Sequence, residues 1–217
     1  MKIFMSLLVS LTLFTQTAHA QKSFINGVIH GNDTITVDLP GSQQFQNIGS
    51  KRDGAGMCVF SAIEMAGLSC GLEQMRGWRN WCAENYNGGS WPEKNDACLR
   101  DWFAYKKIPP IPYIQYEGKD PAPFMELCEK TRRPFGMTYG YSPRYGGRSI
   151  QHMVTGVMFR SNYGVALDNN FPGEDRYEWV DRDEFIRRTI YPNKSAWLFC
   201  WLPPAPPLSP RNPSPKQ

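Results

Sequence analysis

Residues that commonly bind metals are sparse in this chain of 217 residues. It contains only three histidines, and its six cysteines include no C-x-x-C pair and no zinc-finger spacing, which argues against a structural metal site. A large excess of one charge is also missing, because 24 Lys and Arg residues against 20 Asp and Glu residues leave a formal net charge of +4. The basic residues are scattered, whereas a nucleic-acid-binding surface gathers them in a stripe. We therefore expect no metal, no cofactor and no nucleic-acid partner.

Long apolar runs are missing as well, apart from one near the N-terminus. Lys2 precedes an apolar stretch over residues 3–14, which is too short to span a bilayer. Residues 18–20 read Ala-His-Ala, a small-x-small cleavage motif, so the layout is typical of a secretory signal peptide. A membrane anchor or a buried helix is the alternative interpretation. We expect cleavage after Ala20, a secreted or periplasmic protein and no stable insertion into the membrane.

The chain shows no internal repeat, and the expected mature protein is long enough for one domain with a core. We predict a signal peptide over residues 1–20, an extended polar arm over residues 21–48, one domain over residues 49–202 and a tail over residues 203–217. The tail is so rich in proline that it cannot form a core, which indicates a disordered or polyproline spacer. A docking motif for a proline-binding partner is the alternative.

Hydrophobic periodicity indicates that helices come first in the domain and strands second. Helices are predicted over residues 57–66, 72–86, 92–107, 123–130 and 182–190. Strands are predicted over residues 34–40, 135–141, 152–159, 163–167, 177–180 and 195–202. Prolines between residues 109 and 112 predict an extended crossing between the two halves, and Asp181 with Glu184 resembles a capping box for the last helix. This order predicts an α+β fold with two lobes.

Cys58 lies where a glycine-rich loop, residues 49–56, runs into the first predicted helix. A helix N-terminus carries partial positive charge and unpaired amide groups, and both lower the pKa of a thiol and favour the nucleophilic thiolate. The same amide groups can stabilise an oxyanion. We interpret Cys58 as a candidate nucleophile. A buried or disulfide-bonded structural cysteine is the alternative.

His152 is the candidate base, because the other two histidines are poorly placed. His19 would leave with the signal peptide, and His30 lies in the polar arm. His152 begins a predicted strand, which is a rigid mount for a catalytic side chain, and a base near a thiol activates it as a nucleophile. A hydrogen-bonded polar residue at a strand end is the alternative interpretation.

A third group should accept a hydrogen bond from the second ring nitrogen of the histidine and so orient it. The strand that pairs with the His152 strand ends in Asp168, Asn169 and Asn170, and antiparallel pairing brings this end back beside His152. Strand alternation places Asp168 and Asn170 on one face and Asn169 on the other. We rank Asp168 first and Asn169 second as the orienting residue; a simple turn is the alternative.

Residues 58–62, Cys-Val-Phe-Ser-Ala, resemble the nucleophile segment of papain-like cysteine peptidases. The chain order of cysteine, then a histidine opening a strand, then Asp or Asn ending the next strand is also similar to that superfamily. Residues 168–170, followed by residues 177–179 and the helix at residues 183–185, look more like its bacteriocin-processing-like and transglutaminase-like branches. The resemblance implies a papain-like fold, in which an N-terminal helical lobe packs against a C-terminal antiparallel sheet lobe, and a peptide or protein substrate.

The chain departs from the papain-like pattern at one position. Such enzymes carry a glutamine shortly upstream of the cysteine that completes the oxyanion hole, whereas Arg52 and Asp53 stand there in this sequence. Gln44, Gln46 and Asn47 lie further away, and loss of one such donor costs on the order of a hundredfold or more in rate. The departure therefore bears on activity more than on fold.

Three functional hypotheses remain open. The first is an exported thiol hydrolase that cleaves a peptide or isopeptide bond through an acyl-thioester on Cys58, with His152 as general base and acid. The second is a transglutaminase-like acyltransferase, and the third is an inactive binding module on the same fold. Export would permit disulfides, and with Cys58 kept free we expect two bridges and one spare thiol. A structural protein held by disulfides would instead pair all six cysteines. The oligomeric state is not indicated.

Overall fold

The structure is a computed structural model, and it describes residues 24–25, 28–29, 39, 41–47, 57–171 and 177–202. The expected signal peptide, the proline-rich tail and nearly all of the strand expected over residues 34–40 lie outside the described residues. The described part of the chain forms five α-helices and one eight-stranded sheet, so the predicted α+β class is confirmed. None of the helices in this part is long and apolar enough to cross a membrane.

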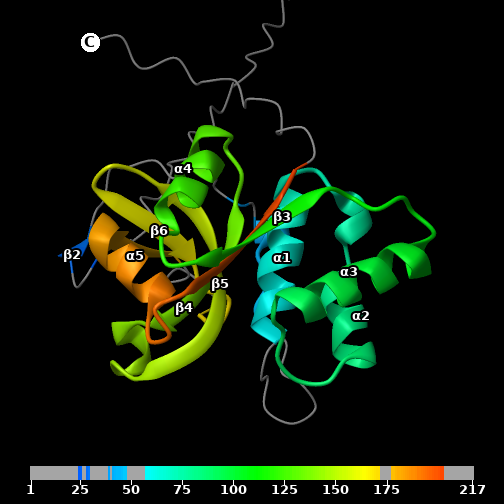
Figure 1. The fold of residues 1–217 in the computed structure, drawn as a ribbon, viewed down its shortest axis with the longest axis horizontal. Coiled ribbons are helices and arrows are strands. Elements are labelled where there is room, and N and C mark those ends of the chain that lie inside the picture. The colour runs from blue at the N-terminus through cyan, green and yellow to red at the C-terminus, as the bar shows by residue number, and fades with distance from the viewer. Residues whose placement is uncertain are drawn as a thin grey trace, which may run out of the picture.

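The first lobe is helical and lies to the right in Figure 1. It contains α1 (Met57–Ser69), the 3-10 helix η2 (Glu73–Met75), α2 (Trp78–Asn85) and α3 (Pro92–Lys106). Helix α1 is composed mainly of apolar residues, and every one of its residues except the last is buried. Such a helix needs apolar partners on all sides. It finds them because it lies between the sheet and the other helices of this lobe.

The helix predicted over residues 72–86 is divided in the structure, so that prediction was wrong. Gly77 adopts a positive φ of 88° between η2 and α2, a conformation that glycine tolerates. The buried carboxylate of Glu64 in α1 accepts hydrogen bonds from the amides of Gly77, at 2.8 Å, and Arg79, at 2.7 Å. These bonds satisfy amide groups at the start of α2 from a neighbouring helix. A tertiary contact therefore sets where α2 begins.

The second lobe is built on the sheet. Its strands are β1 (Phe24–Ile25), β2 (Val28–Ile29), β3 (Tyr113–Gly118), β4 (Phe135–Tyr141), β5 (Ser149–Phe159), β6 (Tyr163–Leu167), β7 (Tyr177–Asp181) and β8 (Ala196–Trp201). They lie in the order β2-β1-β7-β6-β5-β4-β8-β3, antiparallel from β7 to β3, with β1 parallel to β7. The hairpin predicted from β5 and β6 is present. Strand β3 follows the prolines, where only an extended crossing was predicted, and it pairs with β8.

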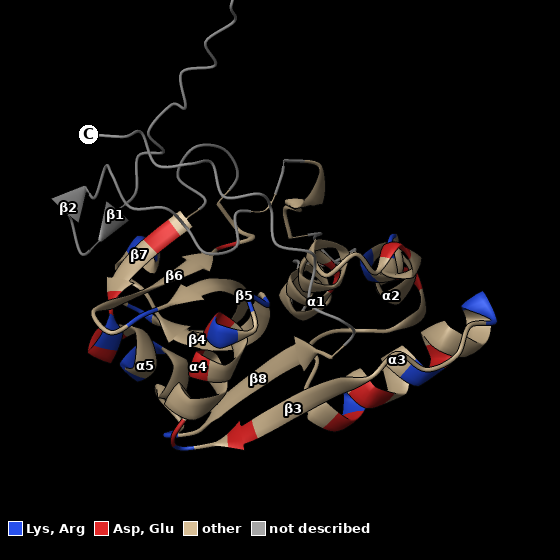
Figure 2. Ribbon diagram, turned by 90° about the horizontal axis from the view of Figure 1, so that it is seen from above, with Lys and Arg blue, Asp and Glu red and all other residues tan. Residues whose placement is uncertain are grey.

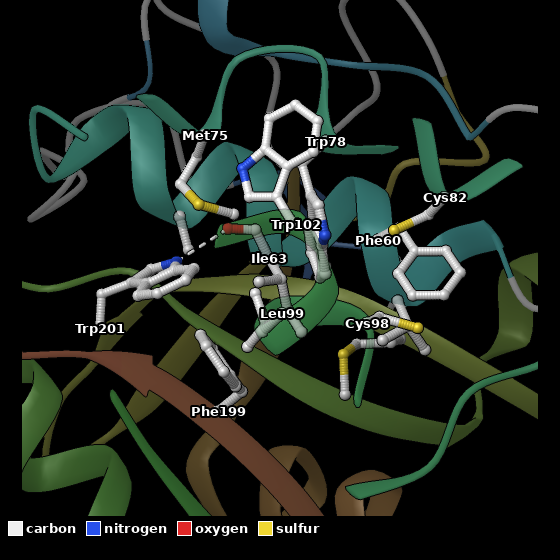
Figure 3. Packing of buried hydrophobic residues seen from close by; sticks show 14 of the residues in the cluster. Phe60, Ile63, Met75, Trp78, Cys82, Cys98, Leu99, Trp102, Phe199 and Trp201 are labelled. Carbon is white, nitrogen blue, oxygen red and sulfur yellow. Dashed lines mark hydrogen bonds between the residues drawn. The ribbon is translucent and has the colours of Figure 1, made fainter. Parts of the chain in front are cut away.

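Helices cover both faces of the sheet, and strand β8 shows this most clearly. Its residues Leu198 and Cys200 pack with side chains of α4 (Ala122–Lys130) and α5 (Arg182–Ile190). The alternate residues Phe199 and Trp201 pack with α1, and the Trp201 ring nitrogen donates to the carbonyl of Ile63 at 3.0 Å (Figure 3). All six residues of β8 are buried because both faces are covered.

The outer helices carry charged residues of both signs. Acidic and basic residues alternate along α3, and α5 carries both signs (Figure 2). Asp181 is the N-cap residue of α5, but its side chain makes no capping hydrogen bond. Glu184 instead contacts Arg187 and Arg188 in the following turn. The predicted capping box is therefore wrong, because these ion pairs engage the glutamate.

Candidate active site

Cys58 is the second residue of α1 and lies at the boundary between the two lobes. Its side chain is buried, and its sulfur accepts a hydrogen bond at 3.4 Å from the amide of Met153 on β5. The amide of Val59, in the first turn of α1, also donates to the sulfur. Amides of a first helical turn have no intrahelical partner and are free to do so. The glycine-rich loop over residues 49–56 lies outside the described residues.

His152 lies on β5, which begins three residues earlier than the predicted strand. Its Nε2 is 2.9 Å from Oδ1 of Asp168 and donates to that carboxylate. The other ring nitrogen, Nδ1, is thus left for the thiol, and the side chains of Cys58 and His152 are hydrogen-bonded to each other. The structure therefore brings together the candidate nucleophile, base and orienting residue in the order that the sequence predicted.

The thiol and the imidazole perturb each other's protonation. Burial raises the pKa of Cys58, but the hydrogen bond and charge of His152, with the amides of Met153 and Val59, outweigh burial, so the pKa of this thiol lies below its ordinary value. Burial lowers the pKa of His152, yet its contacts with Asp168 and Cys58 raise it to about 9. Both shifts favour a thiolate–imidazolium pair, the nucleophilic form of such a dyad.

Asp168 is buried at the end of β6 and is held by several donors. Its oxygens accept from the hydroxyl of Tyr145, at 3.0 and 2.9 Å, and from the amide of Asn170, at 3.0 Å, in addition to the His152 ring. Burial raises the pKa of this carboxyl, and these hydrogen bonds together with the charge of His152 bring it below the usual value. Asp168 therefore stays ionised opposite the imidazole.

Tyr145 was missed as a site residue by sequence reasoning. It directly precedes Gly146 and Gly147 in the sequence. Both glycines adopt positive φ, 67° and 71°, in a tight turn after the 3-10 helix η3 (Pro143–Tyr145). This conformation suits glycine, and it lets the tyrosine hydroxyl reach Asp168, 23 positions further along the chain.

Asn169 faces away from the imidazole, as strand alternation predicted for the neighbour of Asp168. Its Nδ2 donates to the carbonyl of Cys58 and to the carbonyl of Met153, each at 3.1 Å. It thereby ties the first turn of α1 to β5, across the boundary between the lobes. Asn170 donates to the Tyr145 hydroxyl at 3.1 Å. Asp168 is thus the orienting residue, and Asn169 positions the two elements that carry the dyad.

A cavity of about 540 Å³ opens beside the dyad, and both Cys58 and His152 line it. Its other lining residues are Val59, Gly89, Ser90, Thr138, Tyr139, Gly140, Ile150, Gln151, Met153, Thr189, Tyr191, Pro192, Asn193, Ser195 and Trp197. None of these described lining residues is Asp, Glu, Lys or Arg. The stretch from Thr189 to Trp197 can lie close to β4 because Gly140 has no side chain; a Cβ there would overlap the Tyr191 carbonyl. No sequence pattern identified this wall.

Two of the three upstream amide side chains considered as oxyanion donors are engaged elsewhere. Gln44 donates to the carbonyl of Leu39 and to the hydroxyl of Tyr177. Asn47 donates to the side chain of Asn170 at 3.0 Å. Gln46 is an exposed residue whose carbonyl accepts from Arg79 at 2.6 Å. None of the three lines the cavity. The backbone amides at the start of α1, beside Cys58, remain candidate oxyanion donors.

Comparison with known proteins adds no relative. Neither a family model nor a curated protein nor a solved structure matches this chain. Within the described residues, no cluster of three or more His, Cys, Asp or Glu side chains could hold a metal ion.

Proposed function

We propose that this protein is an exported thiol hydrolase that cleaves a peptide or isopeptide bond. One observation carries the proposal: the Cys58 thiol, the His152 ring and the Asp168 carboxylate form a single hydrogen-bonded chain on the wall of a cavity. We further propose that the fold is papain-like. The position of the thiol at a helix start between the lobes, opposite a histidine on the sheet, supports this assignment.

In the acylation step, the Cys58 thiolate attacks the carbonyl carbon of the scissile bond. The developing oxyanion lies near the first turn of α1, where the Cys58 amide can donate to it. The His152 imidazolium then gives its proton to the leaving nitrogen as the carbon–nitrogen bond breaks. An amine departs, an acyl-thioester remains on Cys58, and His152 is left neutral beside the Asp168 carboxylate.

In the second step, a water molecule replaces the departed amine. His152 removes a proton from this water as it attacks the thioester, and Cys58 leaves as a thiolate while the acid product departs. If an amine attacks in place of water, the same intermediate transfers its acyl group, which is the transglutaminase-like outcome. The chemistry up to the thioester is identical for both.

The cavity wall supports a preference for uncharged groups beside the scissile bond. The described lining combines aromatic, aliphatic and neutral polar side chains such as Tyr191, Ile150 and Asn193, with no carboxylate or basic side chain except the His152 ring. A charged substrate side chain would lose hydration there and gain no ion-pair partner, which costs free energy. We therefore propose substrates with an apolar or neutral polar residue at this position.

The experiment is thiol labelling followed by turnover. The purified full chain is treated with an epoxide probe or iodoacetamide near pH 7, and the modified peptide is identified by mass spectrometry. We expect selective modification of Cys58 and its loss in His152→Ala, whereas Cys70→Ala, a substitution at another buried cysteine, should label like the unaltered chain.

Turnover is then measured on a pooled peptide library with and without an added primary amine. New peptide ends support hydrolysis, and amine-linked products support acyl transfer. An unmodified Cys58 with no turnover would contradict the proposal and favour the inactive binding module.

A further inference from the structure

Four cysteines lie outside the candidate active site as two neighbouring pairs. Cys82 in α2 and Cys98 in α3 belong to the core of the helical lobe, and Cys128 in α4 and Cys200 in β8 belong to the core of the sheet lobe. None of the four is more than 2% exposed, and all six cysteines of the chain carry free thiols in the structure. The proposed chemistry at Cys58 makes no use of them.

The first pair joins two helices of the helical lobe. The thiols of Cys82 and Cys98 lie close enough to perturb each other's pKa, and Figure 3 shows both side chains in the same packed core, beside Phe60. Tyr86 holds the helices together at this level: its amide donates to the Cys82 carbonyl at 2.9 Å, and its hydroxyl donates to Asp101 of α3 at 2.6 Å. The two sulfur atoms are therefore neighbours across a fixed helix–helix contact.

The second pair joins a helix to the sheet. Cys128 and Cys200 are buried in the same core cluster, and their thiols also perturb each other's pKa. Arg133 connects their backbones, because its amide donates to the Cys128 carbonyl at 2.9 Å and its Nη1 donates to the Trp201 carbonyl at 2.7 Å. The Cys200 thiol donates to that same carbonyl at 3.3 Å.

We propose that Cys82–Cys98 and Cys128–Cys200 are disulfide bonds in the exported protein, and that Cys58 and Cys70 remain thiols. Cysteines packed in the same core, on elements that are already tied together, need little movement to form a bridge. Two thiols also fall short of the four ligands of a structural zinc site. This proposal does not depend on the candidate enzymatic activity. It depends only on a compartment that permits disulfides.

Each bridge forms by exchange with a donor disulfide, such as oxidised glutathione or a thiol–disulfide oxidoreductase. One cysteine thiolate attacks a donor sulfur and releases the other donor half as a thiolate, which leaves a mixed disulfide. The second cysteine thiolate then attacks the protein sulfur of that mixed disulfide and releases the remaining donor half. Two protein thiols are oxidised, and one donor disulfide is reduced to two thiols.

Cys70 is the alternative disulfide partner for Cys200. It lies near enough to Cys200 for the two thiols to affect each other's charge. However, Cys70 belongs to the core cluster of the helical lobe, whereas Cys128 and Cys200 share the core cluster of the sheet lobe. The geometry thus assigns Cys200 to Cys128 and leaves Cys70 as the spare thiol.

The test is a disulfide map. The full chain, reduced and unfolded, is refolded in a mixture of reduced and oxidised glutathione, blocked with N-ethylmaleimide in denaturant, and digested without reduction. We expect two cross-linked peptide pairs, Cys82 with Cys98 and Cys128 with Cys200, and the maleimide on Cys58 and Cys70 alone. A Cys70–Cys200 bridge, any bridge to Cys58, or six blocked thiols would overturn the proposal.

Matched variants sharpen the map. Cys82→Ala and Cys128→Ala should each release one partner thiol, which raises the count of free thiols by one while the other bridge persists. Cys70→Ala should keep both bridges and lower the count by one. Loss of a bridge in Cys70→Ala would contradict the assignment. The readout here is mass rather than turnover. An inactive protein that carries both bridges would therefore contradict the proposed function and still support the proposed disulfide bonds.

Discussion

Helix α1 has a buried cysteine at each end, and the two thiols differ in their chemistry. Cys58 is 4% exposed at the first turn, and Cys70, which directly follows the last helical residue, is 7% exposed. Burial raises the pKa of both thiols. His152 overcomes this effect at Cys58, where the pKa falls below its ordinary value, whereas burial and the neighbouring Cys200 raise the pKa of Cys70 to about 12 despite the charge of Arg133.

The difference shows that partners, rather than burial, decide which of the two thiols has a lowered pKa. The partner of Cys58 comes from the other lobe, because β5 supplies both the His152 ring and the amide of Met153. The end of α1 near Cys70 faces core residues instead. The helix dipole acts in the same direction, since it favours a negative charge at the first turn and disfavours one at the last.

The strongest test of this comparison removes each thiol in turn. Cys58→Ala should abolish turnover, a loss on the order of 10⁵-fold or more, because no other group can form the acyl intermediate. Cys70→Ala should leave turnover within about twofold, since distant surroundings of a site contribute little to its chemistry. The measurement is kcat/KM on a fluorogenic peptide derived from the library. Turnover that survives in Cys58→Ala would assign the chemistry to another group.

A second test compares how much Cys128, Cys82 and Cys70 each contribute to the stability of the protein. In the oxidised protein, Cys128→Ala should lower the free energy of unfolding by about 4 kcal/mol and Cys82→Ala by about 3 kcal/mol. The loss is larger for Cys128→Ala because the Cys128–Cys200 bridge closes the longer loop. Cys70 forms no bridge and so closes no loop. Cys70→Ala should therefore lower the free energy of unfolding by only about 1 kcal/mol, as a typical small core truncation does. Guanidinium unfolding measures all three. Equal losses in the three variants would contradict the assigned pairing.

A third test weakens the partner of the reactive end. His152 must be protonated to give its proton to the leaving amine, so the rate should fall as pH rises through about 9. Asp168→Asn removes the carboxylate that raises this pKa, so the alkaline limb should move to lower pH, and the rate near pH 7 should fall by roughly ten- to a hundredfold. The pH profile of kcat/KM checks this. Asp181→Asn, at the exposed end of β7, is the control, and an unmoved limb would contradict the role of Asp168.

The smallest expected effect concerns the hydroxyl behind Asp168. Tyr145→Phe removes one hydrogen bond to the carboxylate while the Asn170 amide and the His152 ring remain, so kcat/KM should fall by about fivefold, equivalent to roughly 1 kcal/mol. The pKa of Asp168 should rise toward its ordinary value, which makes the loss larger at acid pH than at neutral pH. Tyr116→Phe, whose hydroxyl bonds only to the distant Asp120 backbone, is the matched control. A loss that does not vary with pH would indicate a purely structural role.

Secondary structure could be predicted wherever local signals decide it. Helix α3 begins at Pro92 and β4 spans Phe135–Tyr141, both as predicted, because proline favours a first helical position and alternation marks a strand. The prediction failed for α2, which begins where Glu64 binds its first amides. It also missed β3, since the prolines before it mark extended chain but give no sign of the strand β8 with which it pairs.

Parts of the candidate site were also predictable. The roles proposed for Cys58, His152 and Asp168 follow from a helix start, a strand start and a strand end, which are local features. No local sequence pattern marks Tyr145 or the cavity wall around Tyr191. Tyr145 reaches the site through a glycine turn, and the wall does so through close packing on Gly140. Contacts of this kind depend on the path of the whole chain.

The sequence by itself therefore determined the α+β order of elements and three groups suited to thiol chemistry, since these depend on residue type and near neighbours. Only the tertiary structure decided which of Cys58 and Cys70 has a lowered pKa. The two cysteines lie at opposite ends of one helix, and one of the amides that reach the Cys58 sulfur belongs to a residue 95 positions away. The pKa of a thiol depends on charges and donors within a few ångströms, and in a folded chain those neighbours come from distant segments.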